Sequence, residues 1–593
     1  MINERFFQNQ DLSLPPRRHL EYPSITMFEM LQQVEQEYPD APAYEFYRRK
    51  VSFKSFINDI EAAGAAFLKL GVTAGCPVTI CLPNVPQALT AFYGINRIGA
   101  VANMIHPLSA VSEIVYYLNV SDSPWIVTLD MFYEKVRMAA DQADHPVRII
   151  VCRMQDALPF PLNAAYLAKE GRKHLKYPRA GSKDVLWTNI MAAEKIKSDK
   201  AVREKLPVCS YDPERTAVIL YSGGTSGKPK GICLTDLNFN ALALQAVEAI
   251  REKFEPGLTI LSCMPLFHGF GLGINIHTAL THGVCCILMP TFNIKTYSNM
   301  LIKRRPNFIA GVPTLFDALL HAPALENADL SMLHGCFCGG DSLTVELKKR
   351  VDKFLKDRGA QCQIREGYGL TECVTASCLT PKNEYRERSI GLPFPDTYYD
   401  IVKPGTDVTC PPMEEGEIVL KGPSLMLGYL HNEEETAQAL RRRSDGDLWL
   451  YTGDLGYMDE DGYVYFSQRI KRMIVTNGYN VYPSQLENVL DAHPLVDCSC
   501  IIGIPDERRG QKVKAYVVLK KHGQETEETK ERLLAHMAQH VAGYALPKEI
   551  EFRKELPKTL VGKVAYRILQ EEEVNESLEI HKELKEMNIS GKG

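Results

Sequence analysis

The chain has 593 residues, with 68 Lys and Arg against 73 Asp and Glu, and a formal net charge of −5 at pH 7. This acidic balance argues against a basic nucleic-acid-binding protein. With 45% hydrophobic and 24% charged residues, the composition is that of a chain that buries large cores and not that of a disordered segment. Because one hydrophobic core cannot serve so long a chain, we expect more than one domain.

From the N-terminus to about residue 467, short apolar runs alternate with helical patterns. The run at 78–82 is typical of a buried strand, and the segment 86–98 that follows it is typical of a helix. Repetition of this pairing predicts layers of sheets and helices. We therefore expect an α/β fold in a large N-terminal domain over residues 1–468.

After residue 469 the predicted elements become shorter. Strands are expected at 473–475, 496–504, 513–519 and 550–552, and helices near 484–490 and 533–541. Ser484 and Glu487 have the spacing of a capping box at the start of the first of these helices. The pattern predicts a small α+β domain over residues 469–593, joined to the large domain by the polar segment 469–472, which is a candidate hinge.

One segment of the large domain combines an apolar stretch with a run of positive charge. Residues 158–162 are apolar and punctuated by proline, and they are followed by Lys169, Arg172, Lys173, Lys176, Arg179 and Lys183. A solvated surface insertion is the simpler interpretation of this segment, 158–183. A weak contact with a membrane surface is the alternative.

The sixteen cysteines are scattered and include no Cys-x-x-Cys pair. Without paired Cys and His spacing we expect neither a zinc site nor a disulfide framework, and we interpret most cysteines as small buried residues of a reducing compartment. The polar N-terminal residues differ from a signal peptide, and no apolar run approaches the roughly 20 residues that span a bilayer. The expected location is the cytoplasm.

The strongest local signal is a loop at 221–231 that is rich in glycine, hydroxyl groups and lysine. It follows a β-branched strand pattern at 216–220 and precedes a helical pattern near Thr235. Glycine lets backbone amides approach an anion closely, and hydroxyls and lysines add donors and charge, so the loop is suited to bind polyphosphate. It is not a Walker P-loop, because Pro229 follows Lys228. The predicted phosphate-binding residues are Ser222, Gly223, Gly224, Thr225, Ser226, Gly227, Lys228 and Lys230.

Further motifs follow in order through most of the chain. They are Pro265-Leu266-Phe267-His268-Gly269-Phe270-Gly271, Gly339-Gly340-Asp341-Ser342-Leu343, Gly367-Tyr368-Gly369-Leu370-Thr371-Glu372, Tyr451-Thr452-Gly453-Asp454, Arg469-Ile470-Lys471 and Pro557-Lys558-Thr559-Leu560-Val561-Gly562-Lys563. With the phosphate-binding loop, this series resembles that of the adenylate-forming superfamily, which contains acyl- and aryl-CoA ligases, the adenylation domains of peptide synthetases, and luciferases. The resemblance implies an adenylation domain at 1–468 and a mobile lid domain at 469–593.

The reaction that the resemblance implies brings two anions together, because a carboxylate attacks the α-phosphate of ATP. Unit charges ~4 Å apart repel by about 4 kcal/mol at an effective dielectric constant near 20, so cations must offset this repulsion. By resemblance, Mg²⁺ is held near Glu372, Lys563 supplies an ammonium group, and Thr371 helps the loop to hold the phosphates. The motif Pro265–Gly271, called the acid-binding motif below, contains His268, which completes the predicted catalytic set.

The resemblance also assigns the nucleotide site. Tyr368 is expected to stack on adenine, and Asp454 to bind the ribose hydroxyls with help from Arg469. The backbone beside the adenine is that of Gly339, Gly340 and Asp341. The same motif also looks like a phosphopantetheine attachment site at Ser342, but its position shortly before 367–372 matches the adenine-binding loop.

The acid-binding motif argues against an amino acid as substrate. Peptide-synthetase adenylation domains commonly carry an Asp for the amino group where this chain has Phe267-His268. The candidate pocket residues are neutral or apolar, which favours a fatty acid first and an aryl acid second. These residues are His268, Phe270, Val312, Thr314 and Val374. The small residues Gly269, Gly271 and Gly273 either leave room for an acyl chain or serve close helix packing.

The resemblance implies a second step with a thiol. In CoA ligases of this superfamily the small domain rotates about a hinge residue that corresponds to Lys471, so that Lys563 leaves the site and the region of Gly478 forms a thiol channel. Arg472 and Gln511 stand where acidic residues are usual. We expect an acyl-CoA synthetase that uses ATP, Mg²⁺ and coenzyme A. The alternatives are an acyl-AMP ligase that loads a separate carrier protein, a luciferase-like oxygenase, and a degenerate nucleotide-binding regulator.

Overall fold

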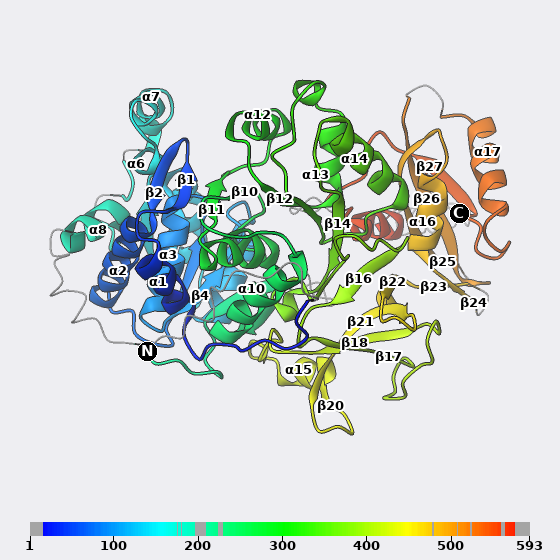
Figure 1. The fold of residues 1–593 in the computed structure, drawn as a ribbon, viewed down its shortest axis with the longest axis horizontal. Coiled ribbons are helices and arrows are strands. Elements are labelled where there is room, and N and C mark those ends of the chain that lie inside the picture. Colours follow the sequence, from blue (N-terminus) through cyan, green and yellow to red (C-terminus); the bar gives the residue numbers. More distant parts are fainter. Residues whose placement is uncertain are drawn as a thin grey trace, which may run out of the picture.

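The computed structural model of the protein describes residues 16–174, 176–179, 181–195, 209–222, 229–476, 479–506, 508–521, 525–558 and 564–575. The predicted α/β architecture is confirmed: two sheets build a large N-terminal domain and a third sheet builds a small C-terminal domain. In Figure 1 the small domain, coloured orange to red, lies at the opposite end from α1 (Met27–Glu37), α2 (Phe53–Lys69) and α8 (Trp187–Lys195). Among the described residues, no helix is both long and apolar enough to cross a membrane.

The first sheet has eight strands and a parallel centre. In spatial order the strands are β19 (Gly428–Tyr429), β9 (Lys230–Leu234), β8 (Val218–Ser222), β4 (Val101–Met104), β3 (Pro77–Cys81), β5 (Trp125–Leu129), β6 (Arg148–Cys152) and β7 (Val185–Leu186). Side chains alternate along β5: Ile126 packs with α4 (Val111–Ser121) and α5 (Tyr133–Asp141), whereas Val127 packs with α2 and α3 (Pro86–Arg97). The strand and helix predicted at 78–82 and 86–98 are β3 and α3.

The second sheet has fourteen strands and changes direction at β14. In spatial order they are β17 (Tyr398–Val402), β18 (Gly416–Lys421), β21 (Leu448–Met458), β22 (Val464–Arg469), β16 (Ser389–Pro393), β15 (Cys378–Leu379), β14 (Ile364–Tyr368), β13 (Gly335–Cys338), β12 (Phe308–Gly311), β10 (Thr259–Ser262), β11 (Cys285–Leu288), β1 (Pro42–Phe46) and β2 (Arg49–Ser52), with β20 (Leu440–Arg442) beside β21. β14 is parallel to β13 and antiparallel to β15. One strand therefore joins the parallel and antiparallel halves.

Further helices among the described residues connect these strands. They are α6 (Met154–Ala157), α7 (Leu162–Lys169), α10 (Asp236–Ile250), α11 (Ala279–Thr281), α12 (Ile294–Arg304), α13 (Pro313–Leu320), α14 (Val345–Asp357) and α15 (Glu433–Ala439), with the π-helix η3 (Phe270–Thr278) packed on α10. Most of the large domain shares one hydrophobic cluster, which extends from Met27 to Val464.

The phosphate-binding loop lies in a different setting from the predicted strand, loop and helix. β8 and β9 are antiparallel neighbours with Ser222 opposite Lys230, so the loop connects the two strands of a hairpin. α10 begins only after β9, at Asp236, where the Thr235 hydroxyl accepts the backbone N–H of Asn238. The apolar residues of β9 are buried throughout, and such a run does not show the alternation by which a strand is recognised in a sequence.

In the described part of the chain, the small domain has five strands, four of them at the predicted places, together with the two predicted helices. The strands are β24 (Tyr479–Val481), β23 (Ile474–Thr476), β26 (Gly510–Leu519) and β25 (Val496–Asp506), with β27 (Glu549–Phe552) beside β26. Along β25, Ile501 packs with α16 (Pro483–Asp491) and α17 (Glu527–Ala538), whereas Cys500 and Ile502 pack with Leu569 on the opposite face. This sheet therefore has its own core on both faces.

The predicted capping box at the start of α16 is wrong. The helix begins at Pro483, and no side chain accepts a hydrogen bond from its first turn. Proline at this position has no N–H that needs a partner. Glu487 instead accepts the backbone N–H of Ile501 at 2.8 Å and forms an ion pair with Arg472 at 2.5 Å.

Arg365 is a buried cation that connects β14 to the end of α10. It is 5% exposed, and its guanidinium donates to the carbonyl oxygens of Ala249, Ile250 and Thr380 at 2.6 to 2.9 Å. The first two belong to the last turn of α10, where carbonyl groups have no partner within the helix. Burial lowers the pKa of Arg365 to about 10, so the group stays charged at neutral pH.

We expect Arg365→Met to lower the free energy of unfolding by about 2–4 kcal/mol, because buried carbonyl oxygens lose their donor. Urea unfolding followed by tryptophan fluorescence measures this change, since the three tryptophans, at positions 125, 187 and 449, all lie in the large domain. Arg350→Met is the matched control, because Arg350 is partly exposed and its ion pair with Asp317 is 3.4 Å long. Equal losses in both variants would contradict the assignment.

Candidate functional site

Two loops at the ends of neighbouring strands form one side of the candidate site. β13 leads into residues 339–341 and β14 ends at Tyr368, and because the strands are parallel neighbours both loops lie at the same sheet edge. Gly340 has a φ of 82°, a conformation that favours glycine. A Cβ atom at Gly339 would lie 3.0 Å from the carbonyl oxygen of Gly367, so the loops touch backbone to backbone. The predicted adenine-binding residues are thus brought together.

Three of the predicted nucleotide-binding residues are joined by a hydrogen bond and an ion pair. The Tyr368 hydroxyl donates to Oδ2 of Asp454 at 2.7 Å, and Nε of Arg469 lies 3.3 Å from Oδ1. Asp454 and Arg469 are opposite each other on β21 and β22. The Asp454 carboxylate raises the pKa of Arg469, and burial together with the same carboxylate holds the pKa of Tyr368 well above its ordinary value. The cation and the phenol therefore both stay protonated.

Glu366 lies beneath the 339–341 loop. Its Oε1 atom accepts the backbone N–H of Leu343 at 3.0 Å. Burial raises the pKa of Glu366 to about 7. The residue directly precedes the predicted Gly367-Tyr368 motif, but a single Glu within a strand carries no pattern that would have identified it from the sequence.

Tyr429, which was not predicted as a site residue, contacts both Glu372 and Lys230, the residues predicted to bind Mg²⁺ and phosphate. Its hydroxyl donates to Oε1 of Glu372 at 2.9 Å, and Nζ of Lys230 lies 4.6 Å from the centre of its ring. Lys230 also forms an ion pair with Glu435 of α15. Burial and the neighbouring Glu372 raise the pKa of Tyr429, so its hydroxyl remains a donor. Neither Tyr429 nor Glu435 belongs to a periodic pattern, so the sequence offered no signal for them.

The side-chain oxygens around Glu372 suit Mg²⁺ only if a phosphate supplies further oxygen ligands. Mg²⁺ prefers oxygen ligands and is commonly bound by one or two carboxylates together with substrate phosphates. Within the described ranges, no group of three or more His, Cys, Asp or Glu side chains is placed to hold a metal alone. Glu372, on the 3₁₀ turn Thr371–Cys373, is therefore suited to hold a cation that also binds a polyphosphate.

The glycines of the acid-binding motif serve close packing. A Cβ atom at Gly269 would lie 1.7 Å from the carbonyl oxygen of Val374, and one at Gly271 would lie 2.1 Å from that of Pro265. At Gly273 it would lie 2.9 Å from the side chain of Leu242. At Gly269 and Gly271 the neighbouring backbone oxygens leave no space for a side chain. Of the two sequence-based interpretations, the structure supports packing and not room for an acyl chain.

Val374 adopts a strained backbone conformation directly beside Glu372. It is fully buried with φ 65° and ψ −58°, and the N–H of Thr375 donates to the carbonyl of Cys373 at 2.8 Å, which forms a γ-turn. A β-branched residue with positive φ is costly and is held by its surroundings, a situation common at functional sites. The turn contacts the motif that carries His268, whose Nδ1 accepts the N–H of Phe270 at 3.2 Å.

Besides Val374, two of the residues predicted to line the acid pocket are buried. Phe270 is 8% exposed and Val312 is 9% exposed. A Cβ atom at Gly339 would lie 3.9 Å from the Phe270 ring, so the acid-binding motif reaches the loop predicted to bind adenine. The acid side and the nucleotide side are therefore neighbours.

The segment between the domains is a 3₁₀ turn at Ile470–Arg472. Arg472, one of the two departures from the family pattern, lies 4.8 Å from the centre of the Tyr566 ring in addition to its ion pair with Glu487. Gln511, the other departure, accepts the N–H of Val475 at 2.9 Å. Both residues thus have partners within the small domain.

Several predicted site residues lie outside the described residues. They are Gly223, Gly224, Thr225, Ser226, Gly227, Lys228, Gly478 and Lys563, together with the side chain of Lys471. The structure does describe residues on both sides of these gaps. Tyr116 donates its hydroxyl to the carbonyl of Pro229 at 2.7 Å, and Lys558 forms a single antiparallel bridge with Val564.

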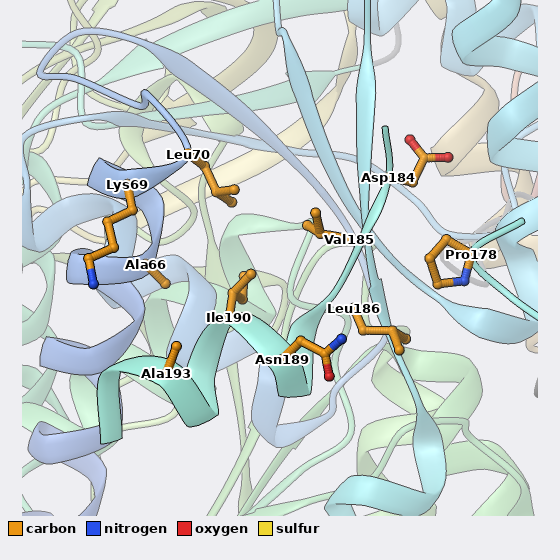
Figure 2. Close-up of a pocket in the computed structure, with 10 residues that line it drawn as sticks. All are labelled: Ala66, Lys69, Leu70, Pro178, Asp184, Val185, Leu186, Asn189, Ile190 and Ala193. Carbon is orange, nitrogen blue, oxygen red and sulfur yellow. The ribbon is translucent and has the colours of Figure 1, made fainter. Parts of the chain in front are cut away.

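A cavity of about 360 Å³ lies elsewhere, between α2, β7 and α8. Figure 2 shows its mostly apolar lining, with Lys69 and Asp184 at opposite ends. Asp184 accepts hydrogen bonds from Tyr133 at 2.7 Å and from Arg137 at 3.2 Å. None of the predicted site residues lines this cavity. We therefore place the candidate site at the ends of β13 and β14, beside Asp454 of β21.

The chain is similar to known proteins over both of its domains. The chain matches the family model of the AMP-binding enzyme over residues 31–430 and that of the AMP-binding enzyme C-terminal domain over residues 485–563. It is 36% identical to a long-chain-fatty-acid–CoA ligase of Bacillus subtilis, over 93% of this chain and 96% of that protein. It is 33% identical to a long-chain-fatty-acid–CoA ligase of Yersinia pestis, over 93% of this chain and 94% of that protein.

The solved structure of ATP-bound MatB from Rhodopseudomonas palustris has the same fold. The TM-score is 0.77 at 23% identity, over 92% of this chain and 99% of that chain. Motif order, fold and family models agree over both domains. The chain belongs to the AMP-binding enzyme family.

Proposed function

We propose that the protein is an AMP-forming acid–thiol ligase. It joins a fatty acid to AMP at the expense of ATP, transfers the acyl group to the thiol of coenzyme A, and releases AMP and pyrophosphate. The observation that carries this proposal is the convergence of the Tyr368–Asp454 and Tyr429–Glu372 hydrogen bonds just beyond β14. Full-length relatives that are named long-chain-fatty-acid–CoA ligases support a fatty acid as the substrate.

In this proposal the nucleoside part of ATP lies across the end of β14. The Tyr368 ring flanks the adenine, and the 339–341 loop lies beside it. The Asp454 carboxylate, already held by Tyr368 and Arg469, accepts hydrogen bonds from the ribose hydroxyls. Because the carboxylate is held in place before the nucleotide binds, binding costs little side-chain entropy at this position.

The chemical step forms a bond from the substrate carboxylate to the α-phosphorus while pyrophosphate leaves. Lys230, Thr371 and residues 222–228 hold the phosphates, and Lys563 approaches the reacting oxygens. Mg²⁺ bound near Glu372 would neutralise phosphate charge. Tyr429 fixes the orientation of the Glu372 carboxylate through its 2.9 Å hydrogen bond. The protein thus contributes positioning and positive charge and not a covalent intermediate of its own.

Capture by coenzyme A requires the small domain to move. We assign residues 1–468 and 469–593 to the two moving bodies, with the hinge at Lys471. Rotation withdraws Lys563 and brings the region of Gly478 to the site, where it borders the thiol channel. The separate core of the small domain supports movement as a unit.

A pyrophosphate-release screen over fatty, aryl and amino acids, run with and without coenzyme A, tests the proposal. We expect release with fatty acids and formation of a thioester when coenzyme A is present. Adenylate formation without thioester would instead support an acyl-AMP ligase that loads a carrier protein. Absence of release with every acid would contradict both.

The state of the cysteines supports a reducing, cytoplasmic location. All sixteen are thiols in the structure, and twelve of them are buried. Disulfides are rare in the cytosol, where thiols are kept reduced. Detection of the protein in a cell fraction enriched in cytosol and peripheral membrane proteins would agree with this location.

We also propose that segment 158–183 contacts a membrane surface. Phe160 is 84% exposed and Leu162 is 44% exposed. α7, which follows, has no buried residue and projects from the large domain at the upper left of Figure 1. A groove of about 600 Å³ lies between Phe160 and Arg49. Exposed apolar groups beside the basic residues of this segment suit an anionic lipid surface, from which a fatty acid can be collected.

Tyr429→Phe should lower kcat/KM for ATP roughly tenfold and raise the Mg²⁺ concentration that gives half-maximal rate, because the Glu372 carboxylate loses the hydroxyl that orients it. Initial-rate measurements at varied Mg²⁺ check this. Tyr398→Phe is the control, since Tyr398 is 48% exposed on β17. If Tyr429→Phe changes the rate no more than the control does, the positioning role is wrong.

Lys563→Ala should abolish acyl-adenylate formation and leave thioester formation from supplied acyl-adenylate largely intact, because only the first step uses this ammonium group. Pyrophosphate release measures the first step, and thioester formation from synthetic acyl-adenylate and coenzyme A measures the second. Lys558→Ala, in the same motif, is the control. Equal loss of both steps would argue against the two-conformation mechanism.

Replacement of Arg172, Lys173 and Lys176 by Gln should weaken co-sedimentation with anionic vesicles. Each basic residue near a charged surface contributes about 1 kcal/mol, so the triple variant should bind at least tenfold more weakly. The ion pair of Lys173 with Glu170 makes its own share smaller than that of the other two. Replacement of Lys349, Lys353 and Lys356 on α14 removes the same charge elsewhere. Unchanged vesicle binding in the segment variant would refute the contact.

A further inference from the structure

Two cysteines on neighbouring strands of the second sheet face each other. Cys336 belongs to β13, and Cys362 precedes β14 by two residues. The strand register places Cys336 opposite Ile364, and side chains two positions apart share a sheet face. Accordingly, Sγ of Cys336 lies 3.6 Å from Sγ of Cys362, with a hydrogen bond between the thiols.

The two thiols have different environments. Cys336 is fully buried in the large core, whereas Cys362 is partly exposed at the edge of that core. The Cys336 thiol, by hydrogen bonding, lowers the pKa of Cys362, although burial and the carboxylates of Glu252 and Asp352 oppose this effect. A reachable sulfur with increased thiolate character thus lies against a buried partner thiol.

Cys362 differs from the other fifteen cysteines. Its pKa is lowered, whereas burial or a thiol hydrogen bond raises the pKa of each of the others. Reactive cysteines combine accessibility with thiolate character, and redox-sensing cysteines commonly lie beside a resolving thiol. Cys362, a partly exposed residue hydrogen-bonded to Cys336, combines these features.

We propose that Cys336 and Cys362 form a redox modification site that closes to a disulfide across β13 and the start of β14. The oxidant is a hydroperoxide. The Cys362 thiolate attacks its terminal oxygen, which breaks the O–O bond, gives a sulfenic acid and releases hydroxide or alkoxide. The Cys336 sulfur then attacks the Cys362 sulfur, the S–O bond breaks, and water leaves with the Cys336 proton. Two thiols lose two electrons in total, and the peroxide gains them.

Closure of this disulfide would act on the strands that carry the nucleotide loops. A disulfide holds its sulfurs about 2.05 Å apart, so they must approach from the present 3.6 Å. The start of β14 is anchored by the Ile364 N–H on Asp352 at 2.8 Å and by Lys348 on the Ile364 carbonyl at 3.2 Å. We expect closure to displace the start of β14 relative to β13 and α14, and the same two strands lead to residues 339–341 and Tyr368.

The first test is peptide mapping of the purified full-length protein before and after treatment with hydrogen peroxide. We expect a peptide pair linked through Cys336 and Cys362 that has lost two hydrogens and separates on addition of dithiothreitol. Links between other cysteines, or oxidation of Cys362 to sulfinic acid without a link, would overturn the proposal. This measurement requires no variant and does not depend on the proposed enzymatic activity.

Variants assign the order of the steps. Cys362→Ser should abolish the link. Cys336→Ser keeps a hydrogen-bonding group beside Cys362 but cannot form a disulfide, so it should leave a Cys362 sulfenic acid that dimedone traps. Cys498→Ser is the matched control, because Cys498 is also partly exposed and hydrogen peroxide should still form the link in this variant. Equal dimedone labelling of Cys498 and Cys362 in Cys336→Ser would contradict a selective site.

The functional consequence rests on the proposed use of ATP. Reduced protein is first shown to release pyrophosphate, and then the linked and reduced forms are compared. We expect linkage to raise the KM for ATP roughly tenfold, as misplacement of binding loops by about 1 Å can do, and dithiothreitol to reverse it. An unchanged KM in fully linked protein would overturn the coupling to the nucleotide loops. Failure of the reduced protein to release pyrophosphate would instead count against the proposed function alone.

Discussion

The change of direction at β14 determines where the site can form. This strand is parallel to β13 on one side and antiparallel to β15 on the other. Parallel pairing places the 339–341 loop beside Tyr368, and the antiparallel half of the sheet brings Asp454 within hydrogen-bond distance of the same tyrosine. Ligands of open α/β sheets commonly bind outside the carboxyl ends of parallel strands, and this is where β13 and β14 end. The junction therefore brings the residues proposed for the base and the ribose together.

Two residues predicted to hold the phosphates and Mg²⁺, Lys230 and Glu372, already have partners before any nucleotide binds. Lys230 is paired with Glu435 and lies against the Tyr429 ring, and Tyr429 in turn holds Glu372. A polyphosphate that binds Lys230 must therefore compete with Glu435. One anionic partner replaces another, so the Lys230 ammonium group has a counter-charge both with and without the polyphosphate. The cost of removing this group from water is therefore similar in the free and the bound protein.

The sequence predicts the architecture well because its signals are local and periodic. Strands such as 496–504 and 513–519 alternate between two apolar faces, and this is the property that defines β25 and β26. The resemblance of the ordered motifs to those of the superfamily implies that Tyr368, Asp454 and Arg469 act together, and the structure brings these three residues together. Predictions based on spacing alone are weaker: Ser484 and Glu487 have the separation of a capping box, yet Glu487 binds Arg472.

Features that depend on distant contacts could not be predicted. Tyr429 and Glu372 are 57 residues apart, and no pattern in either segment indicates the other. β9 was missed because a fully buried strand does not alternate. The packing role of Gly269 becomes visible only through its distance to Val374.

The crowded glycines of the π-helix restrict how this scaffold can change its choice of acid. At Gly269 and Gly271 any side chain would collide with main-chain oxygen atoms, which rotamer changes elsewhere cannot move aside. Substitutions that change the range of acids must therefore fall at neighbouring residues that already have side chains, such as Phe270 and Val312. Variants drawn from a random library of residues 269–271 and 312 should accordingly divide into folded proteins altered at Phe270 or Val312 and misfolded proteins altered at the glycines.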